Sequence, residues 1–256
     1  MPRPVVAWEE PAATAAVRAL IGDRAVAKQS GGYLDTLGDD IVSRSGSQAL
    51  MESSLLPVIY ERLWRPALFG AATAGISEAD EADMMRTLLE LRPGDRILDV
   101  GCGPGNTLRR LVESIGPDGL AVGVDAARGM LERAVADTTA PNVAYVRADG
   151  AMLPFADGAF DAVSCFGTLY LVDRPFAVID ELARVLAPGG RVAILTTCHR
   201  APGPLRPLID LGRPLSGFRW FDPDEISAAL NRAGLTAVRR EIRGLMQFVG
   251  AAKPAA

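Results

Sequence analysis

Between residues 96 and 196 the chain alternates short apolar runs with segments of helical periodicity, and this alternation constrains the fold more than any other feature. The apolar runs predict buried strands at residues 96–100, 120–124, 143–148, 160–166 and 191–196. Strands that alternate with helices need crossover connections, and such connections produce a parallel sheet covered by helices on both faces. We therefore predict a doubly wound α/β core.

The C-terminal part predicts two further strands, at residues 235–242 and 245–251. They follow a helix that Asp222-Pro223-Asp224-Glu225 starts and Gly234 ends. Only Gly244 and its neighbours separate the two strands, so they must pair antiparallel as a hairpin. The expected sheet therefore has seven strands.

The first third of the chain has a different character. Residues 12–21 could form one helix, which Gly31-Gly32 would interrupt. Apolar residues recur at roughly helical spacing over residues 55–69 and predict short, proline-punctuated helices. We expect residues 1–75 to form a helical N-terminal extension and lid, and residues 76–256 to form the core domain.

The first predicted strand leads into the loop Gly101-Cys102-Gly103-Pro104-Gly105, and Asn106 opens the following helix. A loop without side chains lets the backbone approach a ligand closely and aims helix N-terminal N–H groups at it. Dinucleotide-binding loops have the spacing G-x-G-x-x-G, whereas here Asn106 takes the third position and Gly105 comes one residue early. The spacing disfavours NAD. Taken alone, the loop could also be a tight turn.

Acidic residues end three consecutive predicted strands: Asp99, Asp125 and Asp149. The carboxyl ends of neighbouring parallel strands meet at one ligand crevice. A carboxylate can accept hydrogen bonds from an ammonium, from both ribose hydroxyls or from an adenine amino group, and Gly150 and Ala151 leave room for a flat ring. Two alternatives stay open: Asp99 could cap the loop, and Asp125 and Asp149 could cap helices.

Together with Gly123-Val124-Asp125, Leu153-Pro154-Phe155, Phe160-Asp161-Ala162-Val163 and residues 181–190, these motifs resemble those of class I S-adenosylmethionine-dependent methyltransferases over roughly residues 80–252. The resemblance implies a Rossmann-like seven-stranded sheet of order 3-2-1-4-5-7-6 with strand 7 antiparallel. It also implies S-adenosyl-L-methionine as the cofactor and methyl transfer by in-line displacement.

In the implied site, the glycine loop lines the methionine moiety, Asp125 binds the ribose, Asp149 with Gly150 binds the adenine, and Phe166 lies near the sulfonium. The expected cofactor-binding residues are Tyr60, Asp99, Gly101, Cys102, Gly103, Asn106, Asp125, Ala126, Met130, Asp149, Gly150, Ala151, Phe166 and Gly167. Cys102 could equally be a small loop residue with no reactivity of its own.

Two N-terminal segments, Gly32-Tyr33-Leu34-Asp35 and residues 60–66, are similar to the segment after the zinc ribbon of bacterial ribosomal RNA guanine methyltransferases. The ribbon cysteines are absent. Their absence and a net charge of −4 disfavour an RNA substrate and favour a small-molecule acceptor. The segment then reads as a cofactor lid, with Tyr60 at the methionine end.

Two residues are candidates for catalysis. His199, the only histidine, follows the fifth strand and could act as a general base toward a hydroxyl, or could be an exposed loop residue. Tyr170 could orient the acceptor or simply pack under the lid. Apolar residues between 205 and 221 could cover a hydrophobic pocket together with residues 55–69, or could be plain core.

Three cysteines, Cys102, Cys165 and Cys198, contain no Cys-x-x-Cys pair, so we expect neither disulfides nor a metal site, and a cytoplasmic protein. No signal peptide and no membrane span is expected. Whether residues 1–30 fold back or exchange with a neighbour in a homodimer stays open.

Two rival functions remain. A non-catalytic S-adenosylmethionine-binding module would have a blocked acceptor pocket. An RNA base methyltransferase without its ribbon would need a basic groove. The residues that could form that groove are Arg109, Arg110, Arg200, Arg206, Arg213 and Arg219.

Overall fold

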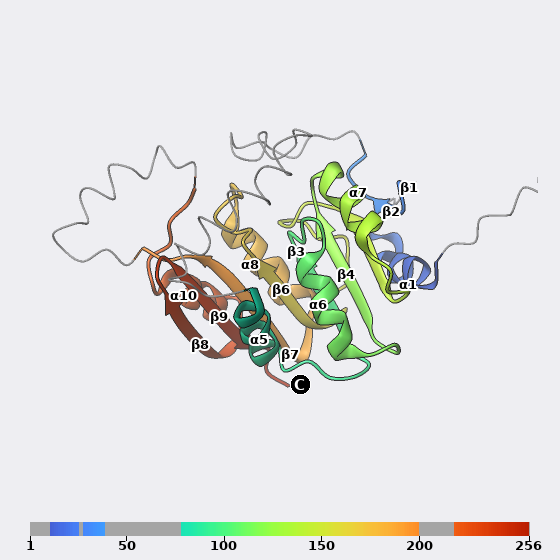
Figure 1. Cartoon of the computed structure of the whole chain (residues 1–256). Helices are drawn as coiled ribbons and strands as arrows, with labels where there is room; N and C mark the ends of the chain where they lie inside the picture. Colours follow the sequence, from blue (N-terminus) through green and yellow to red (C-terminus); the bar gives the residue numbers. More distant parts are fainter. Residues whose placement is uncertain (1–10, 26–27, 39–77, 200–217, 256) are drawn as a thin grey trace, which may run out of the picture.

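Nine strands form one sheet in the computed structural model, which describes residues 11–25, 28–38, 78–199 and 218–255 (Figure 1). The strands are β1 (Lys28–Ser30), β2 (Tyr33–Asp35), β3 (Arg96–Val100), β4 (Leu120–Asp125), β5 (Val143–Arg147), β6 (Phe160–Phe166), β7 (Leu186–Thr197), β8 (Thr236–Arg243) and β9 (Met246–Ala252). The helices are α1 (Ala12–Ile21), the 3-10 turn η1 (Gly22–Arg24), α5 (Glu78–Leu89), α6 (Asn106–Ile115), α7 (Arg128–Asp137), α8 (Pro175–Val185) and α10 (Glu225–Arg232).

The strand order is β1-β2-β5-β4-β3-β6-β7-β9-β8. Strands β3 to β7 run parallel, and β9 lies antiparallel between β7 and β8. The seven strands from β5 to β8 reproduce the order predicted from the sequence, so that prediction and its C-terminal hairpin are confirmed. Parallel strands bring their carboxyl ends to one edge of the sheet, which is where such folds bind ligands.

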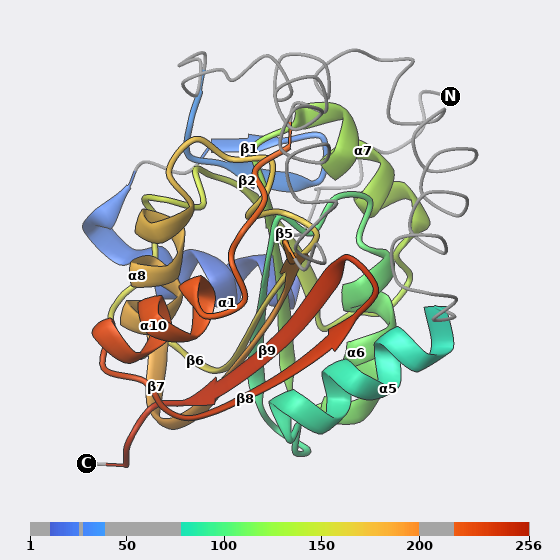
Figure 2. The same ribbon diagram turned by 90° about the vertical axis from the view of Figure 1, so that its left-hand side faces the viewer.

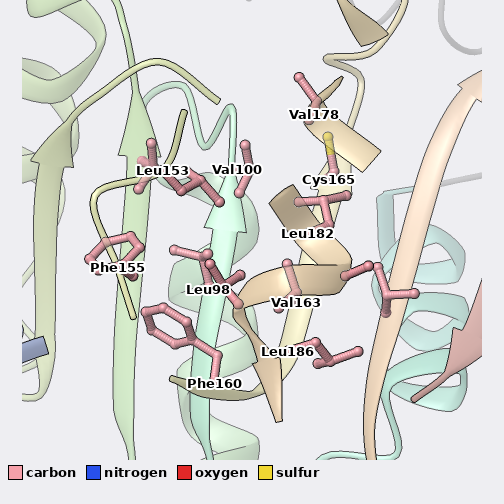
Figure 3. Packing of buried hydrophobic residues seen from close by; sticks show 14 of the residues in the cluster. Leu98, Val100, Leu153, Phe155, Phe160, Val163, Cys165, Val178, Leu182 and Leu186 are labelled. Carbon is pink, nitrogen blue, oxygen red and sulfur yellow. The ribbon is translucent and has the colours of Figure 1, made fainter. Parts of the chain in front are cut away.

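Helices cover both faces of the sheet (Figure 2). Successive residues of a strand point to opposite faces, and β3 shows the division. Ile97 packs among apolar residues of α5, α6 and α7, whereas Leu98 packs with those of α1, α8 and α10. In the second layer Phe155 meets Phe160 edge to face, with ring centroids 5.0 Å apart (Figure 3). The central strands, β3 to β6, are therefore buried on both sides, as their continuous apolar runs require.

The N-terminal segment departs from the expected helical extension. Helix α1 is confirmed, but residues 28–35 form a β-hairpin in which Gly31 and Gly32 make the turn instead of ending a helix. Strand β2 joins the sheet parallel to β5, pairing Leu34 with Val146. Strands of three residues are too short to show an alternating pattern, and β5, which ties the hairpin to the sheet, lies over 100 residues away, so no local pattern predicted this pairing.

The expected lid helices at residues 55–69, with Tyr60, lie outside the described residues, so the lid stays a prediction. In the part of the chain that is described, no helix is both long and apolar enough to cross a membrane.

Candidate cofactor site

The glycine loop connects β3 to α6 at the carboxyl edge of the sheet. Its three glycines, Gly101, Gly103 and Gly105, have φ values of +74°, +52° and +77°, a left-handed backbone that other residues adopt with strain. The amides of Gly101 and Cys102 both donate to the carbonyl of Val124, at 2.8 and 3.0 Å. These bonds fold the loop over the end of β4.

The three glycines meet different surroundings. A Cβ on Gly101 would collide with the hydroxyl of Thr168, and one on Gly105 would collide with the hydroxyl of Tyr145. A Cβ on Gly103 would meet no atom within 4 Å. Packing therefore requires glycine at the two ends of the loop, whereas the middle of the loop presents bare backbone to open space. That open face is what a closely bound ligand needs.

Asp125 links this loop to the next strand end. Its Oδ2 accepts the amide of Gly103 and its Oδ1 accepts the amide of Ala127, both at 2.9 Å. Burial raises the pKa of Asp125, and the backbone donors oppose that rise. A carboxylate has about four lone-pair sites, more than these backbone donors occupy, so it can also accept a hydroxyl donor. Asp125 thus caps its own turn and is also placed to accept from a ribose.

Asp99 lies beneath the loop and is 2% exposed. It accepts a 2.7 Å hydrogen bond from the hydroxyl of Ser164 on β6. Its charge adds to the burial that raises the pKa values of the thiols of Cys102 and Cys165. The structure places Asp99 where either predicted role could act, as a loop support or as an acceptor for an ammonium.

Asp149 follows β5 and is the third acid of the site. Its Oδ1 accepts the amide of Ala151 at 2.8 Å, and its Oδ2 accepts from Nη2 of Arg174, also at 2.8 Å. Nothing in the sequence pattern pointed to Arg174, which directly precedes α8. A Cβ on Gly150 would lie 3.0 Å from Cγ1 of Val100, so this backbone is closely packed.

Gly167 and Tyr170 follow β6 at the same edge. The amide of Gly167 donates to the carbonyl of Leu195 at 3.0 Å, which fixes the turn against β7. The Tyr170 hydroxyl lies 3.4 Å from where a Cβ of Gly167 would stand, and its ring packs edge to face on Phe218 at 5.3 Å. Phe166 packs in the same way on Phe248, at 6.1 Å.

His199 is buried, with a side chain 4% exposed, so the alternative of an exposed loop histidine is wrong. Its amide donates to the carbonyl of Phe221 at 2.7 Å, and its Nδ1 lies 3.8 Å from a carboxylate oxygen of Asp222. The segment around Phe221 thereby covers the end of β7 next to this histidine.

The other expected residues are placed as follows. Asn106 starts α6 and accepts from the guanidinium of Arg109, which also binds the carbonyl of Pro104 at 2.7 Å. Met130 is buried in α7. Cys102 is buried with a pKa well above its ordinary value because of that burial, which agrees with an unreactive loop residue.

Four residues around the site were missed by sequence reasoning. They share one property, a partner brought near by the fold rather than by a motif: Tyr145, Ser164, Thr168 and Arg174. Arg109, which the sequence analysis placed in a possible basic groove, instead binds the glycine loop. Within the described residues no group of three or more His, Cys, Asp and Glu side chains could hold a metal ion.

Comparisons with known proteins agree with this geometry. Residues 97–190 match a family model described as a methyltransferase domain. A demethylmenaquinone methyltransferase of Lactococcus lactis subsp. lactis is 36% identical over 124 residues, 46% of this chain and 49% of that protein. An Arabidopsis thaliana protein named as an uncharacterized chloroplastic methyltransferase is 32% identical over 216 residues, 80% of this chain and 60% of that protein.

Among solved structures, the [4+2]-cyclase SpnF superimposes with a TM-score of 0.64 at 18% identity, covering 84% of this chain and 98% of that one. At this identity the likeness concerns the fold alone. The chain spans between a third and three fifths of the length of the first curated relatives that it matches.

The doubly wound sheet of this strand order, with acids at three strand ends around an open glycine loop, is the arrangement that the resemblance to class I S-adenosylmethionine-dependent methyltransferases implied. The matched segment, residues 97–190, runs from β3 into β7 and contains the loop and all three acids. Residues 97–190 are therefore a methyltransferase domain, and the sheet around them has the fold of the class I enzymes.

Proposed function

We propose that the protein transfers a methyl group from S-adenosyl-L-methionine to a small, predominantly apolar acceptor. The observation that carries the proposal is the Asp125 carboxylate, bound to the amide of Gly103 beside the open face of the glycine loop. This arrangement places a carboxylate that can accept hydrogen bonds from hydroxyls beside bare backbone. Both lie at the edge of the sheet where parallel sheets bind ligands.

In the proposed complex, Asp125 accepts from the ribose hydroxyls, and Asp149 accepts from the adenine amino group beside Gly150. Asp99 and the loop take the methionine end, and Phe166 and Gly167 border the sulfonium. When bound, the cofactor supplies a methyl group whose leaving group is neutral. The protein then has to align the acceptor at about 3–3.5 Å and exclude water, and no obligatory acid–base pair is needed.

The acceptor side of the site is apolar. A buried cluster at the ends of β6, β7 and β9 contains Leu195, Met246 and Phe248, with Phe166 and Tyr170 packed against it. Curated relatives are named for the methylation of demethylmenaquinone and 2-phytyl-1,4-naphthoquinone. These points support an aromatic, quinone-like acceptor. In this scheme the acceptor is in its reduced, quinol form; Tyr170 orients it and His199 removes a proton from one of its hydroxyls.

A small molecule fits better than RNA. Arg109 is committed to the glycine loop, and Arg219 binds Glu225 at 3.2 Å and stacks over the rings of Phe176 and Phe221. Arg200, Arg206 and Arg213 lie outside the described residues. The net charge of −4 also disfavours a polyanion. We place the protein in the cytoplasm, because its described cysteines are all free thiols.

The first experiment is calorimetric titration with S-adenosylhomocysteine and, separately, with NADH. We expect binding of the former alone. A screen with reduced quinones, and with ribosomal RNA as the rival acceptor, then measures methyl transfer. Binding of NADH, or of neither ligand, would contradict the proposal. Methylation of RNA alone would mean that the methyl acceptor is RNA and not a small molecule. Cofactor binding without transfer to any acceptor class would favour the non-catalytic module.

A further inference from the structure

One arginine joins the N-terminal hairpin to the candidate site. Arg147, at the end of β5, donates from Nη1 to both carboxylate oxygens of Asp35 on β2, at 3.3 and 3.2 Å. The same nitrogen reaches the carbonyl of Gly38 at 2.6 Å, and Nε donates to the carbonyl of Ala126 at 2.9 Å. One guanidinium thus holds two segments that lie about 90 residues apart.

The hairpin side of this contact is itself well ordered by hydrogen bonds. Oδ1 of Asp35 accepts the amides of Leu37 and Gly38, at 3.0 and 2.9 Å, and so closes the turn after β2. Arg128, the first residue of α7, donates to the Gly38 carbonyl at 2.6 Å. The turn therefore rests on the start of α7 as well as on β5.

The Arg147–Asp35 pair is buried, with side chains 9% and 7% exposed. Because buried charges are costly unless paired, removing Asp35 leaves the Arg147 guanidinium without its carboxylate, whereas Asp35 has a second cation, Arg128, with Nη2 3.7 Å from its Oδ2. The planar guanidinium can donate in two directions at once, which a lysine ammonium on its flexible stem does far less well. The chemistry of this position therefore asks for arginine specifically.

The other end of the contact is the turn that carries the ribose acceptor. Ala126 follows Asp125, and Asp125 Oδ1 binds the amide of Ala127. The Ala126 carbonyl held by Arg147 thus lies within the turn that Asp125 closes on itself. Freeing that carbonyl would let the peptide rotate, and the carboxylate would lose its fixed direction.

We propose that Arg147 is a positioning residue for ribose recognition, and that the β1–β2 hairpin, through Asp35, holds it in place. This rests on the proposed function, which assigns the ribose to Asp125. It makes the N-terminal hairpin a support of the cofactor site. By linkage, nucleoside binding at Asp125 must in turn stabilise the turn after β2.

The test uses the whole chain and two variants, Arg147→Lys and Asp35→Asn. Adenosine and 2′,3′-dideoxyadenosine are each titrated by calorimetric displacement of S-adenosylhomocysteine. We expect adenosine to bind about tenfold more weakly to either variant than to the wild type. The affinity for dideoxyadenosine should change by about twofold at most, because this ligand lacks the hydroxyls that Asp125 binds. A merely structural role would weaken both ligands alike.

The matched control is Lys253→Met, which removes hydrogen bonds to the carbonyls of Ala183 and Leu186, at 2.9 and 2.7 Å, at the opposite edge of the sheet. It should lower Tm and leave both affinities unchanged. If the Arg147 and Asp35 variants lose equal affinity for the two ligands, or lose none, the inference is overturned while the proposed function stands. Failure of the wild type to bind S-adenosylhomocysteine overturns the proposed function itself.

If the variants do not fold, hydrogen exchange on the wild type decides. Adenosine should slow exchange of the Leu37 and Gly38 amides, which Asp35 holds, and dideoxyadenosine should slow it less. Unchanged exchange at both amides with saturating adenosine contradicts the coupling.

Discussion

At the scale of single residues, two glycines of one loop have separable tasks. Gly101 has no room for a side chain, because Thr168 fills the space, whereas Gly103 faces open space. Both have positive φ, so both would be strained as alanine by about 1–2 kcal/mol. Only the first would also clash inside the protein.

We expect Gly101→Ala to lower the free energy of unfolding by about 2–5 kcal/mol, from backbone strain plus overpacking. Gly103→Ala should cost about 1–2 kcal/mol, yet weaken S-adenosylhomocysteine binding at least tenfold, because its methyl group enters the ligand's space. Urea unfolding and calorimetry measure the two effects. Tight binding by Gly103→Ala would mean that the cofactor lies elsewhere.

Asp125 links stability to pH. Its pKa is raised in the folded protein, mainly by burial, so protonation is easier there than in the unfolded chain. A raised pKa contributes stability below the unfolded value of 3.8, and this contribution is lost as the pH rises through the folded pKa. An asparagine at this position does not titrate.

The free energy of unfolding of the wild type, relative to that of Asp125→Asn, should therefore fall as the pH rises from below 3.8 through the raised pKa, and level off above it. Denaturant unfolding of both proteins from pH 3 upward measures the difference. A difference that grows with pH would show that the backbone donors outweigh burial. The variant should also lose affinity for S-adenosylhomocysteine.

At the scale of elements, the β1–β2 hairpin extends the sheet beyond β5 and packs on α7. A Cβ on Gly32 would lie 2.7 Å from Cγ1 of Val135 in α7, and its φ is +88°. Gly22, at the end of α1, has a φ of +54° and no atom within 4 Å of its Cβ position. The two glycines therefore share backbone strain and differ in packing.

We expect Gly32→Ala to destabilise the protein by about 1–3 kcal/mol more than Gly22→Ala, because only the former pushes the hairpin from α7. Thermal unfolding of the two variants measures the difference. Equal losses of stability in the two variants would show that the hairpin does not dock on α7. They would also weaken the inference that the hairpin holds Arg147 in place.

At the scale of the whole molecule, two apolar layers enclose the sheet and bury all three cysteines. Burial raises the pKa values of the Cys102 and Cys165 thiols, with nearby Asp99 adding to the effect. Since the thiolate is the reactive form, these thiols should be inert in the folded protein.

The thiols of the native protein at pH 8 should therefore react with Ellman's reagent only as fast as local unfolding exposes them. Protein unfolded in guanidinium should react at once and release three equivalents of thionitrobenzoate, one for each cysteine. Bound S-adenosylhomocysteine should slow the native reaction further by mass action. A thiol that reacts rapidly in the native state would contradict the described packing around the glycine loop.

Much of the fold followed from the sequence alone, because local patterns carry it. Buried parallel strands are continuously apolar, helices keep their period, and Gly244 leaves only an antiparallel hairpin possible. The seven core strands and the meeting of Asp99, Asp125 and Asp149 at one edge were therefore predictable, whereas the strand order came from the family resemblance. So was the glycine loop, since its left-handed turns need glycine wherever they occur.

Only the tertiary structure decided the rest, because it depends on residues far apart in the chain. The three-residue strand β2 exists because β5 offers it a partner, and Arg147 meets Asp35 across 112 positions. Arg174 on Asp149 and Ser164 on Asp99 arise in the same way. A short polar segment has many possible partners in sequence, and chain topology alone brings one of them within hydrogen-bonding distance.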